Sequence, residues 1–249
     1  MKRIELFEIG IDNISMEETF NVIEQLIKKK KPSLVVTPNV HHINILKNDD
    51  EFKKIYRQAS MALPDSTPLI WASKLLGTPL KEKVAGSDLL PSFCKIAARK
   101  RYELFFLGSG PSIAKKAANI LTKKYPGLKI VGTYSPPFGF ENDEDENRKI
   151  VAMIKKCTPD VLFVGLGPPK QEKWIWRYKD EINVPVSIAV GASFDFVAGN
   201  VKRAPKWMQH IGFEWFFRLC QEPRRLWKRY LVGNIMFLWL VLKEFIKSD

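Results

Sequence analysis

The sequence predicts an α/β protein whose mostly parallel sheet carries helices on both faces. Residues 161–164 are a short, continuously apolar run, which is typical of a strand buried on both faces of a parallel sheet, and residues 186–190 predict a further short strand. Stretches with helical periodicity alternate with such runs up to about residue 195. In this arrangement the polar ends of the strands gather along one edge, where α/β proteins bind ligands.

Composition and charge restrict the function classes. With 249 residues, of which 45% are hydrophobic and 27% charged, the chain can form one main domain with a sizeable core. The formal net charge of +13 implies an anionic partner: nucleic acid, an acidic membrane surface or a phosphorylated substrate. Charge alone does not choose among these three.

Cysteine usage and the N-terminal segment point to the cytoplasm. Cys94, Cys157 and Cys220 are odd in number and far apart, so neither a disulfide framework nor a zinc site is predicted. Residues 1–8 carry acidic side chains where a signal peptide needs an uninterrupted apolar segment. We therefore expect a cytoplasmic protein.

The first elements lead to a polar strand end. Residues 4–11 predict a strand, and residues 15–30 predict a helix that starts with a capping-box pattern. Residues 34–37 predict the next strand, after which Thr37 and Asn39 precede a helical stretch that extends through residue 56. Small polar side chains are therefore expected at the end of this strand.

Asp65 follows a second short strand. A brief apolar run ends at this carboxylate, and a helix is predicted around residues 69–76. Two interpretations fit: Asp65 caps the helix, or it acts as a catalytic group. Without other information, an Asp at a helix start is more often a cap.

The next strand ends in a glycine-rich turn. Residues 102–107 predict a strand, Gly108 and Gly110 follow, and a helix is predicted over residues 113–124. This is a Rossmann-like turn, but the third glycine of the dinucleotide fingerprint is Ile113 and the following strand ends without an acidic residue. An NAD enzyme is disfavoured, whereas a nucleotide phosphate or sugar remains compatible with the turn.

An acidic run precedes the next helix. Residues 143–145 form an Asp-x-Asp pattern, which many sugar transferases use to hold a metal ion on a nucleotide diphosphate. Acidic residues at a helix N-terminus are expected from the helix dipole alone, and this run does not follow an apolar strand. We interpret it as a solvated helix start and predict no metal site and no cofactor.

The chain is organised around residues 160–174. The central strand is followed by Gly165 and Gly167, and then by two prolines suited to the first turn of a helix that carries Lys170 and Gln171. Free backbone N–H groups, the positive end of the helix dipole and Lys170 favour an anion such as a phosphate. The alternative is a plain connection between a strand and a helix.

The composition changes near residue 200. Residues 200–249, here called the tail, contain ten basic and four acidic residues, a net charge of +6, interleaved with aromatic residues. This mixture suits an interfacial helix lying in a headgroup layer. The alternative is a helical subdomain that packs on the sheet, and both can hold. Residues 235–242 are apolar but far too short to span a bilayer. We predict a catalytic domain over 1–199 and a helical appendage over 200–249.

Together these motifs closely resemble the WecG/TagA/CpsF family of bacterial glycosyltransferases, over nearly the whole chain. The segments that carry the resemblance are 37–39, 64–65, 86–88, 106–110, 165–172, 191–196, 202–205, 214–215 and 221–225. One departure is Ser66, where the family commonly has Gly after the Asp. The resemblance is strongest to members that transfer N-acetylmannosamine.

The resemblance implies a reaction. UDP-N-acetylmannosamine would donate its sugar to undecaprenyl-diphosphate-linked N-acetylglucosamine at the inner face of the cell membrane, in teichoic acid synthesis. The product would carry a β-1,4 linkage, so transfer is a single inversion that needs one base and stabilisation of the departing UDP. The protein would be peripheral on the membrane through its tail, would not bind nucleic acid, and could self-associate away from lipid.

The resemblance and the chemistry together assign candidate residues. Asp65 is the expected base, and Thr37, Asn39 and Gln171 are expected to bind sugar groups. The glycines at the strand ends and Lys170 are expected to bind the donor: Gly108, Gly110, Gly165 and Gly167.

Arginines of the tail are expected to assist the leaving diphosphate: Arg218, Arg224 and Arg225. On one helix starting near Gly212, Arg218 and Arg225 would share a face because they are seven residues apart. The alternatives are a related family member with another UDP-sugar donor, a basic nucleic-acid-binding protein, which lacks a recognised module here, and a nucleotide-dependent oxidoreductase.

Overall fold

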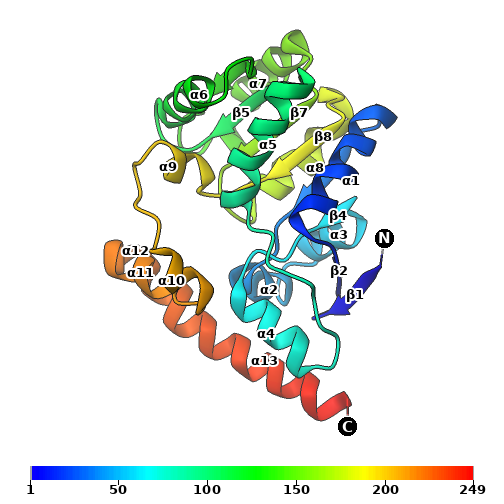
Figure 1. Cartoon of the computed structure of the whole chain (residues 1–249), viewed down its shortest axis with the longest axis vertical. Helices are drawn as coiled ribbons and strands as arrows, with labels where there is room; N and C mark the ends of the chain where they lie inside the picture. Colours follow the sequence, from blue (N-terminus) through cyan, green and yellow to red (C-terminus); the bar gives the residue numbers. More distant parts are fainter. Residues whose placement is uncertain (1, 249) are drawn as a thin grey trace. The chain divides into compact units, whose positions relative to one another are not determined.

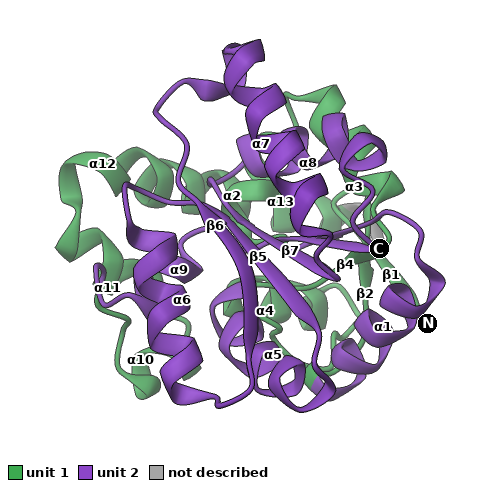
Figure 2. Ribbon diagram, turned by 90° about the horizontal axis from the view of Figure 1, so that it is seen from above, with its two compact units in different colours: residues 1–16, 37–85, 202–249 green, residues 17–36, 86–201 purple. Residues whose placement is uncertain are grey.

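The computed structural model describes residues 2–248, with side chains described through residue 246, and it contains two compact units. Unit 1 comprises Met1–Met16, Thr37–Ala85 and Lys202–Asp249, and unit 2 comprises Glu17–Val36 and Gly86–Val201. Figure 1 follows the elements along the chain, and Figure 2 colours the two units. Met1 and Asp249, which the predicted domains include, lie outside the described residues.

Unit 2 is built on a parallel sheet. Its five strands have the order β3-β8-β7-β5-β6 and all their pairings are parallel. The strands are β3 (Ser33–Val36), β5 (Glu103–Gly108), β6 (Lys129–Tyr134), β7 (Val161–Gly165) and β8 (Val186–Ala189). Every residue of β7 is buried, as its uninterrupted apolar sequence predicts for a central strand.

Helices cover both faces of this sheet (Figure 2). The helix α8 contacts β3, β7 and β8, α7 contacts β6, and α6 contacts β5 and β6. Figure 2 shows α7 and α8 on one face and α5 and α6 on the other. Their bounds are α5 (Gly86–Lys100), α6 (Ile113–Lys124), α7 (Glu144–Cys157) and α8 (Lys170–Ile182). The predicted α/β class is confirmed.

Aromatic packing fixes the carboxyl ends of the central strands. The rings of Phe106 and Phe163 lie edge to face, with centroids 5.8 Å apart, and Phe194 of α9 (Ser193–Val197) lies 4.9 Å from Phe106. Gly108 pairs with Gly165 in register, and a Cβ added to Gly108 would lie 2.5 Å from the Gly165 carbonyl oxygen. Glycine is therefore required at 108 for the two strands to approach this closely.

Unit 1 starts with a hairpin instead of the single strand predicted over residues 4–11. The strands β1 (Arg3–Leu6) and β2 (Ile9–Asp12) pair antiparallel, and the turn residues Phe7 and Glu8 have φ values of 53° and 66°. This is a two-residue turn in the left-handed region, which Asn and Gly signal in most sequences. Phe and Glu rarely adopt this conformation, so no turn residue marks the hairpin in the sequence.

Two helices replace the single helical stretch predicted through residue 56. They are α2 (Val40–Leu46) and α3 (Asp50–Gln58), and Asp49 caps α3 by accepting a hydrogen bond from the backbone N–H of Phe52. The short strand β4 (Met61–Ala62) and the helix α4 (Thr67–Leu75) follow. Asp65 lies in the loop between these two elements.

The tail forms several helices. They are α10 (Lys206–His210), α11 (Glu214–Gln221), α12 (Pro223–Trp227), the π-helical turn η2 (Lys228–Val232) and α13 (Gly233–Ser248). The prediction that Arg218 and Arg225 share one helix is wrong, because Glu222 leaves helical geometry (φ −132°, ψ 58°) and Pro223 starts a new helix.

Within unit 1 the tail packs against the N-terminal half of the chain. The side-chain amide of Asn44 on α2 donates to the Gly233 carbonyl oxygen at 2.8 Å, and the Phe237 ring lies 5.3 Å from that of Phe7. No helix within the described residues has the length and apolar character needed to cross a membrane. The predicted division into 1–199 and 200–249 stays a prediction, because packing within a unit does not test independent folding.

Candidate active site

Asp65 and the segment that begins at Thr37 are joined by their backbones. The N–H of Asp65 donates to the Pro38 carbonyl oxygen at 2.8 Å, and the N–H of Val84 donates to Pro64 at 2.8 Å. Asp65 is half-buried, and the N-cap position of α4 belongs to Ser66, which makes no side-chain capping bond. Asp65 is therefore not the N-cap of α4. The structure brings it together with the segment that begins at Thr37, the other polar strand end predicted from the sequence.

Thr37 and Asn39 are held firmly within this group. Thr37 is buried, and the Asn39 side-chain oxygen accepts hydrogen bonds from the backbone N–H groups of His41 at 3.0 Å and His42 at 3.4 Å. The ring Nδ1 of His42 lies 2.8 Å from the same oxygen. Asn39 is thus the N-cap of α2, and its predicted contact with a sugar stays a prediction.

Sequence reasoning missed Arg229, which lies on η2. Its Nε is enclosed by the protein and has no hydrogen-bond partner among the described residues. Burial is the main cause that lowers the pKa of Arg229, whereas the Asp65 carboxylate acts in the opposite direction. In the sequence Arg229 is one basic residue among many, so nothing distinguished it as the arginine with an enclosed Nε.

His41 shares this environment. Burial, followed by the positive charge of Arg229 and the neighbouring His42, lowers the pKa of His41 to about 3. The imidazole is therefore neutral at physiological pH, where it can exchange hydrogen bonds without adding charge.

Two of the predicted tail arginines lie beside Arg229. Arg218 and Arg225 both contribute to lowering the pKa of Arg229, after burial. They are brought together by Glu222, whose carboxylate oxygens lie 3.4 Å from Arg218 Nη2 and 2.5 Å from Arg225 Nε. We call Arg218, Arg225 and Arg229 the arginine cluster. Arg224 is exposed on α12.

In unit 2 the glycine turns after β5 and β7 lie against each other. The N–H of Ser109 donates to the Gly165 carbonyl oxygen at 2.8 Å, and the Ser109 hydroxyl donates to Asp195 at 2.9 Å. Ser109 and Gly108 both have positive φ values, 58° and 118°. Gly110 follows in the same turn. These residues form a fixed edge at the carboxyl ends of two neighbouring strands.

Gln171 holds two of these turns together. Its side-chain oxygen accepts hydrogen bonds from the backbone N–H groups of Gly167 at 3.2 Å and Gly191 at 3.0 Å. Its amide nitrogen donates to Glu172 at 2.9 Å, and both side chains are buried. The amide is therefore used within the protein, and its predicted contact with the donor stays a prediction.

Lys170 is the first residue of α8. Both predicted first-turn prolines precede the helix, and Pro169 occupies the N-cap position. The Lys170 ammonium lies 2.5 Å from the Glu141 carboxylate and 5.1 Å from the centroid of the Phe138 ring. The phenyl ring itself is fully exposed, at 102%. A cation and an apolar ring thus lie beside the helix start that was predicted to bind an anion.

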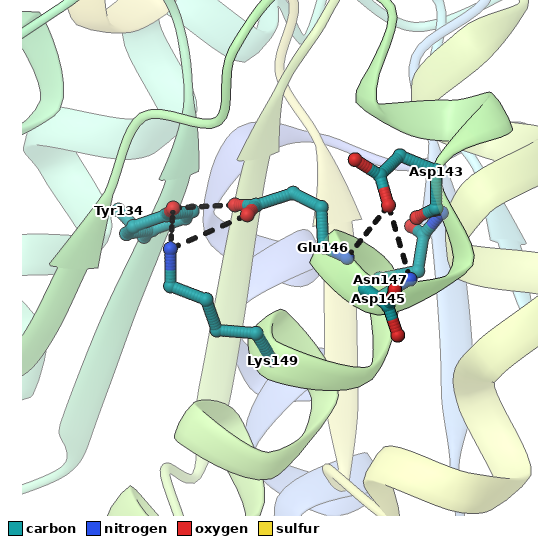
Figure 3. Close-up of polar contacts among 6 residues, drawn as sticks. All are labelled: Tyr134, Asp143, Asp145, Glu146, Asn147 and Lys149. Atoms are coloured by element: carbon teal, nitrogen blue, oxygen red, sulfur yellow. Dashed lines mark hydrogen bonds and ion pairs between the residues drawn. The ribbon is translucent and has the colours of Figure 1, made fainter.

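The Asp-x-Asp run has a structural explanation (Figure 3). Asp143 is the N-cap of α7, and its side chain accepts hydrogen bonds from the N–H groups of Asp145 at 3.0 Å and Glu146 at 3.1 Å. Figure 3 also shows Glu146 directed toward Tyr134 and Lys149. Across residues 2–248, no three His, Cys, Asp or Glu side chains are grouped so that they could hold a metal ion.

Comparison with known proteins adds what geometry alone does not give. The chain matches the glycosyl transferase WecG/TagA/CpsF family over residues 4–249. This protein belongs to that family. The WecG/TagA/CpsF resemblance drawn from its sequence motifs is therefore confirmed.

Three curated relatives share one name, N-acetylglucosaminyldiphosphoundecaprenol N-acetyl-beta-D-mannosaminyltransferase. The protein of Bacillus subtilis (strain 168) is 34% identical over 88% of this chain and 82% of its own length. That of Bacillus spizizenii is 33% identical over 82% of this chain and 77% of its own length. That of Staphylococcus aureus (strain MW2) is 27% identical over 99% of this chain and 95% of its own length.

Proposed function

We propose that this family member transfers N-acetylmannosamine from UDP-N-acetylmannosamine to the C4 hydroxyl of undecaprenyl-diphosphate-linked N-acetylglucosamine. The product carries a β-1,4 linkage and belongs to the linkage unit of wall teichoic acid. The observation that carries this proposal is the shared name of three relatives, each aligned over at least 82% of this chain.

Asp65 is the proposed base. Conversion of an α-linked nucleotide sugar into a β product requires one displacement, in which the acceptor hydroxyl oxygen bonds to the anomeric carbon as the bond to UDP breaks. A carboxylate that accepts the hydroxyl proton in the transition state is sufficient for this chemistry. The half-buried position of Asp65, fixed through Pro38 and next to Thr37, supports this role.

The arginine cluster is proposed to stabilise the departing diphosphate. Charge develops on a phosphate oxygen as the sugar leaves, and guanidinium groups bind such oxygens in a bidentate manner. Arg229 supports this proposal because its enclosed Nε has no partner among the described residues and its charge is opposed by Arg218 and Arg225. Arg224 is retained as a candidate for the same role.

Unit 2 is proposed to bind the donor nucleotide. The paired turns at Gly108 and Gly165 and the start of α8 offer backbone N–H groups and the positive end of a helix dipole. Lys170 adds a positive charge there. Gln171 fixes the Gly167 turn and therefore supports the shape of this surface.

The tail is proposed to dock the enzyme on the inner face of the cell membrane. One face of α13 is exposed at Ile235, Leu238, Trp239, Leu242 and Ile246, by 56–69%. The opposite face is buried at Phe237, Leu240 and Val241. These two sets have helical spacing, so one face packs in the protein and the other remains available for lipid. Away from lipid, the same face is proposed to support self-association.

A product assay tests the proposal. The protein is incubated with a short-chain lipid-diphosphate N-acetylglucosamine acceptor and a panel of UDP-sugars, and the linkage of the product is analysed. The expected outcome is transfer from UDP-N-acetylmannosamine alone with a β-1,4 linkage. Faster transfer from another UDP-sugar would reassign the donor and leave the family assignment intact.

A further inference from the structure

The helix α4, which lies outside the tail, exposes two large apolar side chains. Trp71 is 50% exposed and Leu75 is 58% exposed, and their spacing of four residues places them on one face of the helix. Lys74 is exposed beside them, whereas Leu69, Ile70 and Ala72 are buried. One side of α4 thus packs within unit 1, and the side that carries Trp71 and Leu75 is exposed to solvent.

The exposed face of α4 adjoins the apolar surface of the tail. The Thr67 hydroxyl donates to the Gln209 carbonyl oxygen at 3.2 Å. Gly212 has a φ of 67°, and a Cβ added there would lie 2.8 Å from the Trp71 ring and 3.3 Å from Thr67. The Trp71 ring therefore packs on the turn between α10 and α11. Around this turn Trp207, Ile211 and Phe213 are exposed by 47–62%.

We propose that Trp71 and Leu75 of α4 form, together with the tail, one surface that docks on an anionic phospholipid bilayer. Exposed tryptophans favour this occupant, because Trp is enriched at the boundary between headgroups and acyl chains. Cations lie beside the apolar residues: the ammonium groups of Lys47 and Lys243 lie 5.0 and 5.4 Å from the centroid of the Trp239 ring. Such a mixture matches a negatively charged headgroup layer.

A second copy of the chain fits this surface less well. A two-fold interface brings the same patch of both subunits together, so the positive charges of Lys74, Lys47 and Lys243 would meet like charges. An anionic membrane removes this repulsion. The inference deepens the proposed membrane docking and rests on the proposed function. It adds a consequence: α4 begins two residues after Asp65, so the helix that follows the proposed base would itself rest on the bilayer. Trp71 is only about 6 Å along the helix axis from Thr67.

The test uses the full chain with Trp71→Ser and Leu75→Ser, and the matched control Ile120→Ser, which alters a side chain exposed by 38% on α6 of unit 2. Binding is measured by co-sedimentation with vesicles of phosphatidylcholine alone and with one-fifth phosphatidylglycerol. We expect the α4 variant to bind the anionic vesicles about 10-fold more weakly, because it loses apolar transfer from water. The control should bind like the wild type.

A direct contact probe separates docking from an indirect effect. In a Cys157→Ser, Cys220→Ser background, an environment-sensitive fluorophore is attached at Leu75→Cys or at Ile120→Cys. The label at 75 should shift to the blue with anionic vesicles, and the label at 120 should not. Unchanged vesicle binding together with an unshifted label at 75 would show that the tail docks alone.

Two further outcomes are decisive. A shift of the label at 75 that appears on raising protein concentration, together with a doubled mass in light scattering and no shift on adding anionic vesicles, would assign the surface to a second copy and overturn the proposal. Transfer to a water-soluble acceptor is measured in parallel. The α4 variant should retain it, and its absence in the wild type would instead contradict the proposed function.

Discussion

Asp65 and Arg229 are electrostatically coupled across unit 1. The enclosed guanidinium of Arg229 loses solvation, which lowers its pKa, while the Asp65 carboxylate partly restores it. The proposed base and the proposed anion-binding group thus share one environment, where each would act on charges that develop during transfer. Substitutions at the two positions separate these two proposed roles.

Asp65→Asn removes the proton acceptor and keeps the shape of the side chain. Turnover should fall by roughly 100-fold or more, the usual scale for loss of a general base. UDP affinity and unfolding temperature should remain those of the wild type. Asp180→Asn, an exposed position on α8, is the control and should be silent. Near wild-type turnover of Asp65→Asn would move the base to another residue.

Arg229→Gln tests the residue that sequence reasoning missed. It should lower kcat by roughly 100-fold, the scale observed when one preorganised donor is removed from a transition state. Arg229→Lys should recover part of this loss, because it keeps the charge and loses the planar fork. Steady-state kinetics with Arg99→Gln, an exposed arginine on α5, as control would check this. Equal rates for Arg229→Gln and the control would remove Arg229 from the site.

The sequence predicted the sheet well because its strands are short apolar runs bounded by glycine, as at Val161–Gly165. It predicted the polar strand ends at Thr37 and Asp65 for the same reason. It did not predict which arginine of the basic segment would be partly enclosed: Arg229 and the exposed Arg224 look alike until η2 and α12 are placed. Pro223 was a readable signal that the Arg218 helix stops.

His41 should make stability depend on pH below neutrality. Its folded pKa of about 3 lies below the usual 6.5, so the unfolded chain binds a proton first. The contribution of His41 to the free energy of unfolding is therefore constant above about pH 6.5 and falls as the pH drops toward 3. Between pH 7.5 and 5.0, His41→Gln should reduce this loss by about 1 kcal/mol, allowing for solvent screening. Urea unfolding at both pH values measures it, with the exposed His210→Gln as control. If His41→Gln and His210→Gln lose the same unfolding free energy between the two pH values, His41 is not the cause of the pH dependence.

Asp143 should matter for stability and not for catalysis. Asp143→Ala removes the cap of α7 and should cost about 1 kcal/mol of unfolding free energy, whereas Asp143→Asn should retain most of it. Turnover of Asp143→Ala with Asp145→Ala should stay close to wild type, and EDTA should leave activity largely intact. Strong inhibition by EDTA that added magnesium or manganese reverses would show that the acidic run binds metal.

The last prediction separates anchoring by the tail from the proposed stabilisation of the departing diphosphate by its arginines. Cutting the chain after Gly199 should abolish both vesicle binding and transfer, but it also removes the Asn44 bond to Gly233 and so disturbs unit 1. Point variants avoid this. Leu238→Ser with Trp239→Ser alters only exposed residues of α13 and should weaken vesicle binding while transfer to a water-soluble acceptor persists.

Arg218→Gln with Arg225→Gln should lower transfer to the water-soluble acceptor and leave vesicle binding close to that of the wild type, because these arginines are proposed to bind the diphosphate. Each variant is assayed for co-sedimentation with anionic vesicles and for turnover on the soluble acceptor. Full turnover of the arginine variant would show that the diphosphate leaves without help from Arg218 and Arg225, and Arg229 would remain as the residue of the arginine cluster with that role.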